Sequence, residues 1–138
     1  MEALSCVDGS VMRLPAPFTA TGKAFLSQMS DFEVRRRLSD VLPEPRTPHS
    51  VQTLDALLAE LQTIRRVGYS YDNQQVAEGI VCFGASVLDS RNRPIAGIAV
   101  SLPAEQLTED ERNQIITNVQ RMASRLSARM GADLDFTS

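Results

Sequence analysis

Three side chains of this sequence have the types and positions needed for chemistry on a small molecule. Cys82 and Ser101 supply a thiol and a hydroxyl on two predicted strands, and Asp72 supplies a carboxylate at the end of another. A thiol acts as a nucleophile when a base lies beside it, and the single histidine, His49, belongs to a proline-rich segment far from Cys82 in the sequence. We therefore predict that these groups bind a ligand through hydrogen bonds and that the chain is not an enzyme.

The segment from Thr19 to Lys23 offers a second kind of group. Thr19 or Thr21 can cap the start of a helix, whose first backbone amides have no partner within the helix. These amides and the helix dipole can bind a carboxylate. An ordinary capped helix explains the same residues equally well. A phosphate-binding loop is excluded, because Gly22-Lys23 lacks the required glycine spacing.

A predicted hairpin of residues 80–88 and 95–102 brings the polar groups together. Side chains of a strand alternate between the two faces of a sheet, and the turn at residues 89–94 suggests that Leu88 pairs with Ile95. In that register bulky residues share one face, and a run of small residues lies on the other: Cys82, Gly84, Ser86, Gly97, Ala99 and Ser101. The small face suits either the close approach of a helix or a pocket for a small polar ligand, and both alternatives stay open.

Apolar periodicity, capping residues and turn signals predict the elements that position this hairpin. Helices are expected from Thr19 or Thr21 to Met29 and over residues 30–41, 53–67 and 108–130, and a short strand over residues 69–72. The helices at 53–67 and 108–130 are expected to cover the bulky face of the hairpin. Residues 132–138 are expected to form a loose tail.

The N-terminal segment, residues 1–13, is predicted to form a strand that bends at Asp8-Gly9. A lone strand at a terminus needs a neighbour to pair with. We expect this neighbour to be absent from the sequence or to come from another chain.

Length and composition indicate a single domain and argue against several classes of function. A length of 138 residues, 43% of them hydrophobic, suits one domain over residues 1–138. The net charge of −3 argues against direct contact with nucleic acid, and no apolar run approaches the roughly 20 residues that span a bilayer. The sequence has one histidine, two unclustered cysteines and no signal-peptide pattern, so we predict no metal site and a cytoplasmic location.

The order and spacing of several segments resemble the effector-binding domain of IclR-type bacterial transcription regulators. The matching segments are Leu14-Pro15, Thr19-Ala20-Thr21-Gly22-Lys23-Ala24, Thr47-Pro48, Leu57–Leu61, Arg65–Tyr69, Asp72, Glu78–Cys82 and Ile95–Ser101. Together they cover about residues 9–131. The resemblance implies an α+β fold: a curved antiparallel sheet with helices packed on it, as in profilin-like or GAF-like sensor domains.

The resemblance also implies a function. IclR-type domains bind small organic or aromatic carboxylic acids without a cofactor, form dimers and tetramers, and control an N-terminal winged helix-turn-helix. That DNA-binding part has no counterpart in this sequence, so we expect the chain to be truncated relative to the family. Two other hypotheses stay open: a small thiol enzyme that uses Cys82, and a domain that only oligomerises.

The ligand contacts that the resemblance implies can be carried over residue by residue. Ala20 and Thr21 correspond to the backbone donors to the carboxylate, and the side-chain contacts and apolar wall correspond to Asp72, Cys82, Ser101 and Ile80. Ala99 stands where some members have a second serine. A less polar pocket favours an acid with an apolar or aromatic portion.

Overall fold

The computed structural model describes residues 1–7 and 10–132 of the chain. The predicted Asp8-Gly9 turn and residues 133–138 of the predicted tail lie outside the described residues. The architecture is α+β, as expected, with antiparallel pairing in both of its sheets. Its elements are β1 (Glu2–Val7), β2 (Ser10–Pro15), α1 (Ala20–Ser27), α2 (Asp31–Leu38), α3 (Leu54–Val67), β3 (Ser70–Asn73), β4 (Ile80–Leu88), β5 (Pro94–Pro103) and α4 (Glu109–Arg129), with short 3₁₀ turns at Ala16–Phe18 and Ala104–Gln106.

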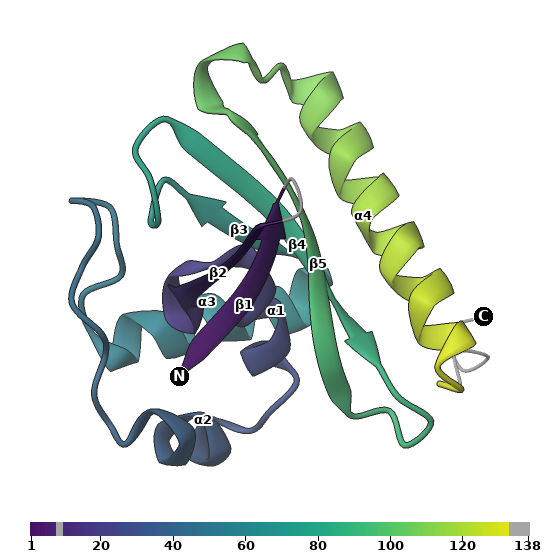
Figure 1. Ribbon diagram of the computed structural model, residues 1–138, viewed down its shortest axis with the longest axis horizontal. Helices are drawn as coiled ribbons and strands as arrows, with labels where there is room; N and C mark the ends of the chain where they lie inside the picture. Colours follow the sequence, from purple (N-terminus) through teal and green to yellow (C-terminus); the bar gives the residue numbers. More distant parts are fainter. Residues whose placement is uncertain (8–9, 133–138) are drawn as a thin grey trace.

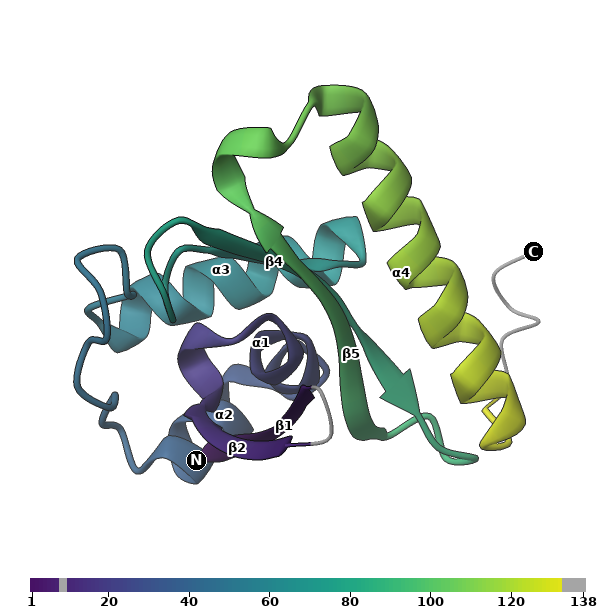
Figure 2. The ribbon, with the colours of Figure 1, turned by 45° about the horizontal axis from the view of Figure 1, so that its top comes forward.

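The main sheet has the strand order β3-β4-β5 and carries helices on both faces (Figures 1 and 2). The hairpin register is confirmed, since Cys82 lies opposite Ser101 and Gly84 opposite Ala99. One detail was wrong: Leu88 pairs with Pro94 and not with Ile95, because the register shifts between Val87 and Leu88. A bulge at the turn changes pairing locally without exchanging the faces of the residues beyond it.

The two faces of the main sheet are covered by different helices. On the bulky face, Val119 and Ala123 of α4 form a buried cluster with Ala85 of β4. On the small face, α1 lies directly against β4 and β5 (Figure 2). Small side chains leave room for a helix backbone there, so α1 comes close to the sheet.

The expected position of α3 was wrong. Its apolar residues, among them Leu57 and Leu61, are buried in a cluster with Phe18, Leu26 of α1 and Val34 of α2, and not on the bulky face of the hairpin. An amphipathic helix can bury its apolar face against helices as well as against a sheet, and the sequence pattern does not distinguish the two.

The expected partner of the N-terminal strand was also wrong. β1 pairs with β2 along its whole length, from Glu2 opposite Pro15 to Val7 opposite Ser10, in a separate two-stranded sheet. The neighbour therefore comes from this chain. In Figures 1 and 2 this hairpin lies beside α1, close to the edge formed by β5.

Three helix ends follow the predicted capping or stop residues. The hydroxyls of Ser30 and Thr108 accept hydrogen bonds from the amides of Glu33 and Glu111, each at 3.2 Å. Gly68 ends α3 with a φ of 85°, a conformation that glycine adopts without strain. Local capping therefore fixes the starts of α2 and α4 and the end of α3. The predicted end of the second helix at residue 41 was wrong, because Ser39 adopts a left-handed conformation and α2 ends at Leu38.

Candidate functional site

One cavity between α1 and the main sheet is lined by all seven residues that were predicted to bind a ligand. Its volume is about 180 Å³. We call it the α1 cavity; its lining residues are Met12, Leu14, Thr19, Ala20, Thr21, Asp72, Val76, Ala77, Ile80, Cys82, Ala99 and Ser101. The structure therefore brings together residues from five separate parts of the sequence.

A row of three polar side chains crosses the sheet at this cavity. Asp72 of β3 lies opposite Cys82 of β4, and Cys82 lies opposite Ser101 of β5. The Cys82 Sγ and Ser101 Oγ atoms are 2.9 Å apart, within hydrogen-bonding distance, and either atom can be the donor. The row can exchange several hydrogen bonds with a ligand hydroxyl or carbonyl oxygen.

The N-terminus of α1 supplies backbone donors at the same cavity. The hydroxyl of Thr19 accepts a hydrogen bond from the Gly22 amide at 2.9 Å, and the Lys23 amide donates to the Thr19 carbonyl. By helix geometry these contacts leave the amides of Ala20 and Thr21 without a partner in the helix. Both residues line the α1 cavity, where a bound carboxylate could accept from these amides.

The sequence left open whether the small face of the sheet contacts a helix or lines a ligand pocket, and in the structure it does both. At one end, a Cβ atom on Gly97 would lie 2.7 Å from the Thr21 carbonyl oxygen, and one on Gly84 would lie 3.1 Å from that of Ala20. Here the absence of side chains lets α1 touch the sheet. At the other end, beside Cys82, the space is the α1 cavity. The close approach therefore holds the start of α1 beside the cavity.

Asp72 is the most deeply buried polar group of the cavity, with only 2% of its surface exposed. Its Oδ1 atom accepts a 2.7 Å hydrogen bond from the Gln75 amide. Burial raises the pKa of the Asp72 carboxyl above its ordinary value of 3.8, while the Gln75 amide and the Lys23 ammonium act in the opposite direction. A higher pKa favours the neutral carboxyl, which can donate a hydrogen bond to a ligand.

A buried ion pair that no local pattern in the sequence predicts supports this site. Lys23 is fully buried, and its Nζ atom lies 2.6 Å from Glu60 Oε1. The same Glu60 oxygen accepts from Gln75 Nε2 at 3.2 Å, and Gln75 in turn holds Asp72 through its own backbone amide. Burial lowers the pKa of Lys23, whereas Glu60 raises it. Lys23 and Glu60 are 37 positions apart, so no local spacing signals the pair.

The environment of Cys82 is unlike that of a catalytic cysteine. Burial raises the pKa of the Cys82 thiol above its ordinary value of 9.0, and the Asp72 carboxylate raises it further. Nucleophilic thiols need a lowered pKa. His49 lies elsewhere, 4.0 Å from Glu78. Cys82 is better suited to hydrogen bonding as a neutral thiol.

The apolar wall of the cavity contains residues that sequence reasoning did not select. Ile80 was predicted, but Leu14 of β2 and Val76 and Ala77 of the β3–β4 loop also line the cavity. The loop is held by Thr47 and Ser50, which flank His49 in the proline-rich segment. The Thr47 hydroxyl donates to the Gln74 carbonyl, and the Ser50 hydroxyl to the Gln75 carbonyl, each at 2.6 Å.

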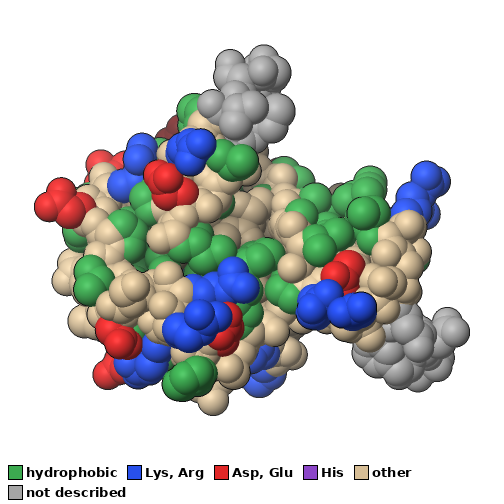
Figure 3. All heavy atoms as spheres, turned by 60° about the horizontal axis from the view of Figure 1, so that its bottom comes forward, with side chains coloured by type: hydrophobic (Ala, Val, Ile, Leu, Met, Phe, Trp, Pro, Cys, Tyr) green, Lys and Arg blue, Asp and Glu red, His purple; other side chains and the backbone are tan. Residues whose placement is uncertain are grey.

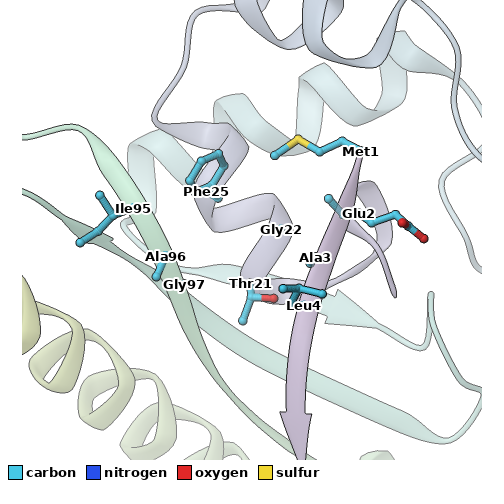
Figure 4. Close-up of a pocket in the computed structure, with 11 residues that line it drawn as sticks. Met1, Glu2, Ala3, Leu4, Thr21, Gly22, Phe25, Ile95, Ala96 and Gly97 are labelled. Atoms are coloured by element: carbon cyan, nitrogen blue, oxygen red, sulfur yellow. The ribbon is translucent and has the colours of Figure 1, made fainter. Parts of the chain in front are cut away.

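A larger hollow of about 330 Å³ lies on the other side of Thr21 (Figure 4). In Figure 4, Thr21 and Gly22 of α1 lie between Leu4 of β1 and Gly97 of β5. Thr21 is the only predicted site residue that lines it. With Leu4 67% exposed at its rim, this hollow is open to solvent and has fewer polar side chains than the α1 cavity.

The described part of the surface carries mixed charges. On the face shown in Figure 3, basic and acidic side chains are interspersed. In the only dense basic run, Arg36 and Arg37 pair with Glu33, and Arg35 pairs with Asp55. Within residues 1–7 and 10–132, no three His, Cys, Asp or Glu side chains are grouped to hold a metal ion. None of the helices in those residues has the length and hydropathy to span a bilayer.

Comparison with known proteins identifies the family. The profile of the bacterial transcriptional regulator IclR C-terminal family matches residues 8–128. The chain belongs to this family. The helix-turn-helix regulator KdgR of Dickeya chrysanthemi is 32% identical to this IclR-family domain over 119 residues, which are 86% of this chain and 39% of that protein. The chain therefore spans about two fifths of the length of that relative.

Solved structures of IclR-family proteins support the fold. The repressor BlcR of Agobacterium tumefaciens has a TM-score of 0.83 and 39% identity, and the match covers 89% of this chain and 49% of BlcR. The C-terminal domain of Escherichia coli KdgR has a TM-score of 0.83 and 30% identity, and the match covers 91% of this chain and 77% of that domain. The predicted fold class and family are both confirmed.

Proposed function

We propose that this IclR-family domain binds a small organic carboxylic acid in the α1 cavity and thereby controls a transcription regulator. The ligand carboxylate accepts hydrogen bonds from the backbone amides of Ala20 and Thr21. A keto or hydroxyl oxygen of the ligand contacts Asp72, Cys82 and Ser101. The domain senses the ligand without a chemical step, and the regulated DNA contact is made by a helix-turn-helix domain outside this chain.

The observation that carries this proposal is the meeting of two kinds of donor at one cavity. The start of α1 and the row from Asp72 to Ser101 are far apart in the sequence, yet both line the α1 cavity. Anion donors beside hydrogen-bonding side chains and an apolar wall are the elements of a site that orients a small acid.

The size and lining of the α1 cavity define the ligand class. Its volume of about 180 Å³ is below the range of about 300–1,000 Å³ that suits drug-sized molecules. The walls formed by Leu14, Val76 and Ile80 are apolar, and Ala99 contributes a methyl group. An acid with a short aliphatic chain or a single aromatic ring therefore fits better than glyoxylate, which leaves these walls uncovered.

Calorimetric titration tests the proposal with glyoxylate, pyruvate and benzoate. We expect binding, and tighter binding of an acid that carries an apolar portion than of glyoxylate. The variant Ser101→Ala should weaken binding about fivefold, since a neutral hydrogen bond contributes about 1 kcal/mol. The matched control is Ser124→Ala, which removes the hydroxyl of an exposed residue of α4 that does not line the α1 cavity.

Two results would contradict the proposal. One is an unchanged affinity for the acid in both Ser101→Ala and Asp72→Asn, which would mean that the acid does not bind in the α1 cavity. The other is the absence of any acid that raises the melting temperature, because a ligand of the native state must stabilise it. The second result would favour a domain that only oligomerises.

The thiol-enzyme hypothesis has less support. The raised pKa of Cys82 and the position of His49 beside Glu78 both oppose a reactive thiolate. Slow alkylation of Cys82 by iodoacetamide at neutral pH is the expected result. Rapid alkylation, together with turnover that Cys82→Ser abolishes, would favour the enzyme instead.

Self-association and a cytoplasmic location belong to the same proposal. IclR-family membership supports dimers or tetramers formed through this domain, and a regulator that acts on DNA works in the cytoplasm. The exposed side chains of Val100 on β5 and Met122 on α4, 42% and 51% exposed, offer apolar surface for association. Sedimentation equilibrium should detect a dimer or tetramer; a monomer at all concentrations would contradict this part.

A further inference from the structure

A second cavity lies between α3, β3 and the start of α4, and it is separate from the α1 cavity. Its volume is about 260 Å³, and we call it the Arg112 cavity; its lining residues are Glu60, Thr63, Ile64, Val67, Tyr69, Tyr71 and Arg112. Tyr71 and Asp72 are neighbours on β3, so their side chains leave the strand on opposite faces. The two cavities therefore belong to opposite faces of the main sheet.

Arg112 is held in an unusual environment for a cation. Its guanidinium carbon lies 5.1 Å from the centre of the Tyr71 ring and 5.5 Å from that of Phe83, and these two rings stack on each other 4.9 Å apart. Contact with both rings holds the guanidinium against Tyr71 and Phe83. The side chain is thus pre-oriented before any acceptor arrives.

The hydrogen-bonding capacity of Arg112 is not used by the described residues. Its Nε atom is buried and has no hydrogen-bond partner there. A buried N–H group, and above all one on a cation, is normally paired. Arg112 also lines the cavity and forms no ion pair with the described residues, so an acceptor that enters the cavity can pair with its guanidinium.

The charge of the cavity lining favours an anion. Glu60 also lines the cavity, but its Oε1 atom is engaged by the buried Lys23 ammonium at 2.6 Å, so this pair is neutral as a unit. The positive charge of Arg112 is therefore not neutralised by any other described residue that lines the cavity. Its guanidinium presents parallel N–H groups that match the two oxygens of a carboxylate.

We propose that the Arg112 cavity is a second ligand site, which binds the carboxylate of a small organic acid through Arg112. The organic portion packs against Ile64, Val67 and Tyr69. These apolar and aromatic walls distinguish an organic carboxylate from inorganic phosphate, which would leave them uncovered. This site does not depend on ligand binding in the α1 cavity.

Nuclear magnetic resonance of the full 138-residue chain tests the proposal directly, because the Nε–H group of an arginine gives its own signal. Titration with benzoate should shift the Arg112 Nε–H signal and the backbone amides of Tyr69 and Tyr71 to saturation. Benzamide, which has the same shape without the charge, should leave these signals in place. Inorganic phosphate at equal concentration should shift them less than benzoate.

Matched variants on α4 separate Arg112 from a general effect of charge. Arg112→Met should weaken benzoate binding at the Tyr71 amide about tenfold, as expected when a charge-assisted hydrogen bond is lost. Arg121→Met removes an exposed arginine of the same helix and should leave the affinity unchanged. Even if Arg112→Met is unstable, the wild-type comparison of benzoate with benzamide decides the matter.

Several outcomes would overturn the second site. They are equal shifts with benzamide, a response to phosphate alone, shifts confined to residues of the α1 cavity such as Thr21 and Cys82, or unchanged affinity in a folded Arg112→Met variant. Each would show that Arg112 does not recognise an organic carboxylate.

Discussion

At position 72 the fold places a carboxyl group where water barely reaches it. The Gln75 amide donates to this carboxyl at 2.7 Å, and the buried Lys23 ammonium is close enough to favour its ionised form. Burial has the larger effect and raises the pKa of Asp72. A ligand carboxylate that binds beside Asp72 is repelled less when Asp72 is neutral, so the raised pKa helps the proposed site to accept an acid.

The raised pKa of Asp72 predicts a pH dependence of stability. Between 3.8, its ordinary value, and the raised value, the folded state binds more protons than the unfolded state, so this group lowers the free energy of unfolding as pH rises. Asp72→Asn keeps an acceptor for the Gln75 amide but cannot ionise. We expect the stability of Asp72→Asn relative to wild type to increase with pH through this window, as measured by urea unfolding. A difference that is constant or that falls with pH would contradict the prediction.

The residues of the α1 cavity differ in how far the sequence reveals them. Cys82 and Ser101 can be found because strand alternation and the turn set their register. Lys23 and Gln75 cannot be found this way, because their roles depend on contacts with Glu60, 37 and 15 positions away in the chain. Tertiary packing, and not local spacing, decides which polar group is buried beside Asp72.

Among the elements, α1 has the largest effect on the proposed site, because it presents its N-terminus to the cavity. Its distance from the sheet is set by Gly84 and Gly97, where a Cβ atom would meet the backbone of Ala20 and Thr21 at 3.1 Å and 2.7 Å. Sequence analysis identifies a face of small residues, but it cannot tell which part of that face touches a helix and which part stays open. The answer depends on the tilt of α1 across the strands.

Gly97→Ala should move the start of α1. A new methyl group would lie 2.7 Å from the Thr21 carbonyl oxygen, which belongs to the backbone and cannot turn away. We expect a loss of about 1–3 kcal/mol in the free energy of unfolding, typical of overpacking, and weaker acid binding in the α1 cavity. Ala96→Ser, on the neighbouring position of β5, is the control for a change on this strand. Wild-type stability and affinity in Gly97→Ala would show that the close approach does not position the amides.

The packing partners of α3 and β1 also could not be predicted from local sequence patterns. The apolar face of α3 is plain in the sequence, yet it packs on α1 and α2, because helices and sheets bury an apolar face equally well. The strand at residues 2–7 was expected, but its partner was not, because a six-residue return strand, β2, has weak alternation of its own.

Across the whole molecule, the two sides of the main sheet are packed very differently. The side of α1, α2 and α3 holds a cluster of large buried residues that includes Phe18, Leu26, Leu57 and Leu61. The side of α4 holds a cluster with fewer buried residues, Ala85, Val119 and Ala123, against which the partly buried Ile98 and Ile115 pack. Apolar burial stabilises roughly in proportion to area, so α4 is attached less firmly than α3.

Hydrogen exchange should reveal this difference, because α4 can detach while α1–α3 stay folded. Ser127 is a buried residue of α4 whose hydroxyl accepts from the Leu88 amide at 2.9 Å. Ser127→Ala leaves that amide without its partner and should weaken the attachment of α4 by about 1.4 kcal/mol, which corresponds to about tenfold faster exchange. We expect the faster exchange in α4 and the end of β4, and little change in α3. Ser124→Ala changes an exposed serine one turn earlier that makes no hydrogen bond to the Leu88 amide, and it should leave exchange as in wild type. Equal acceleration in α3 and α4 would mean that the two sides of the sheet open together, and α4 would then be part of a single cooperative unit.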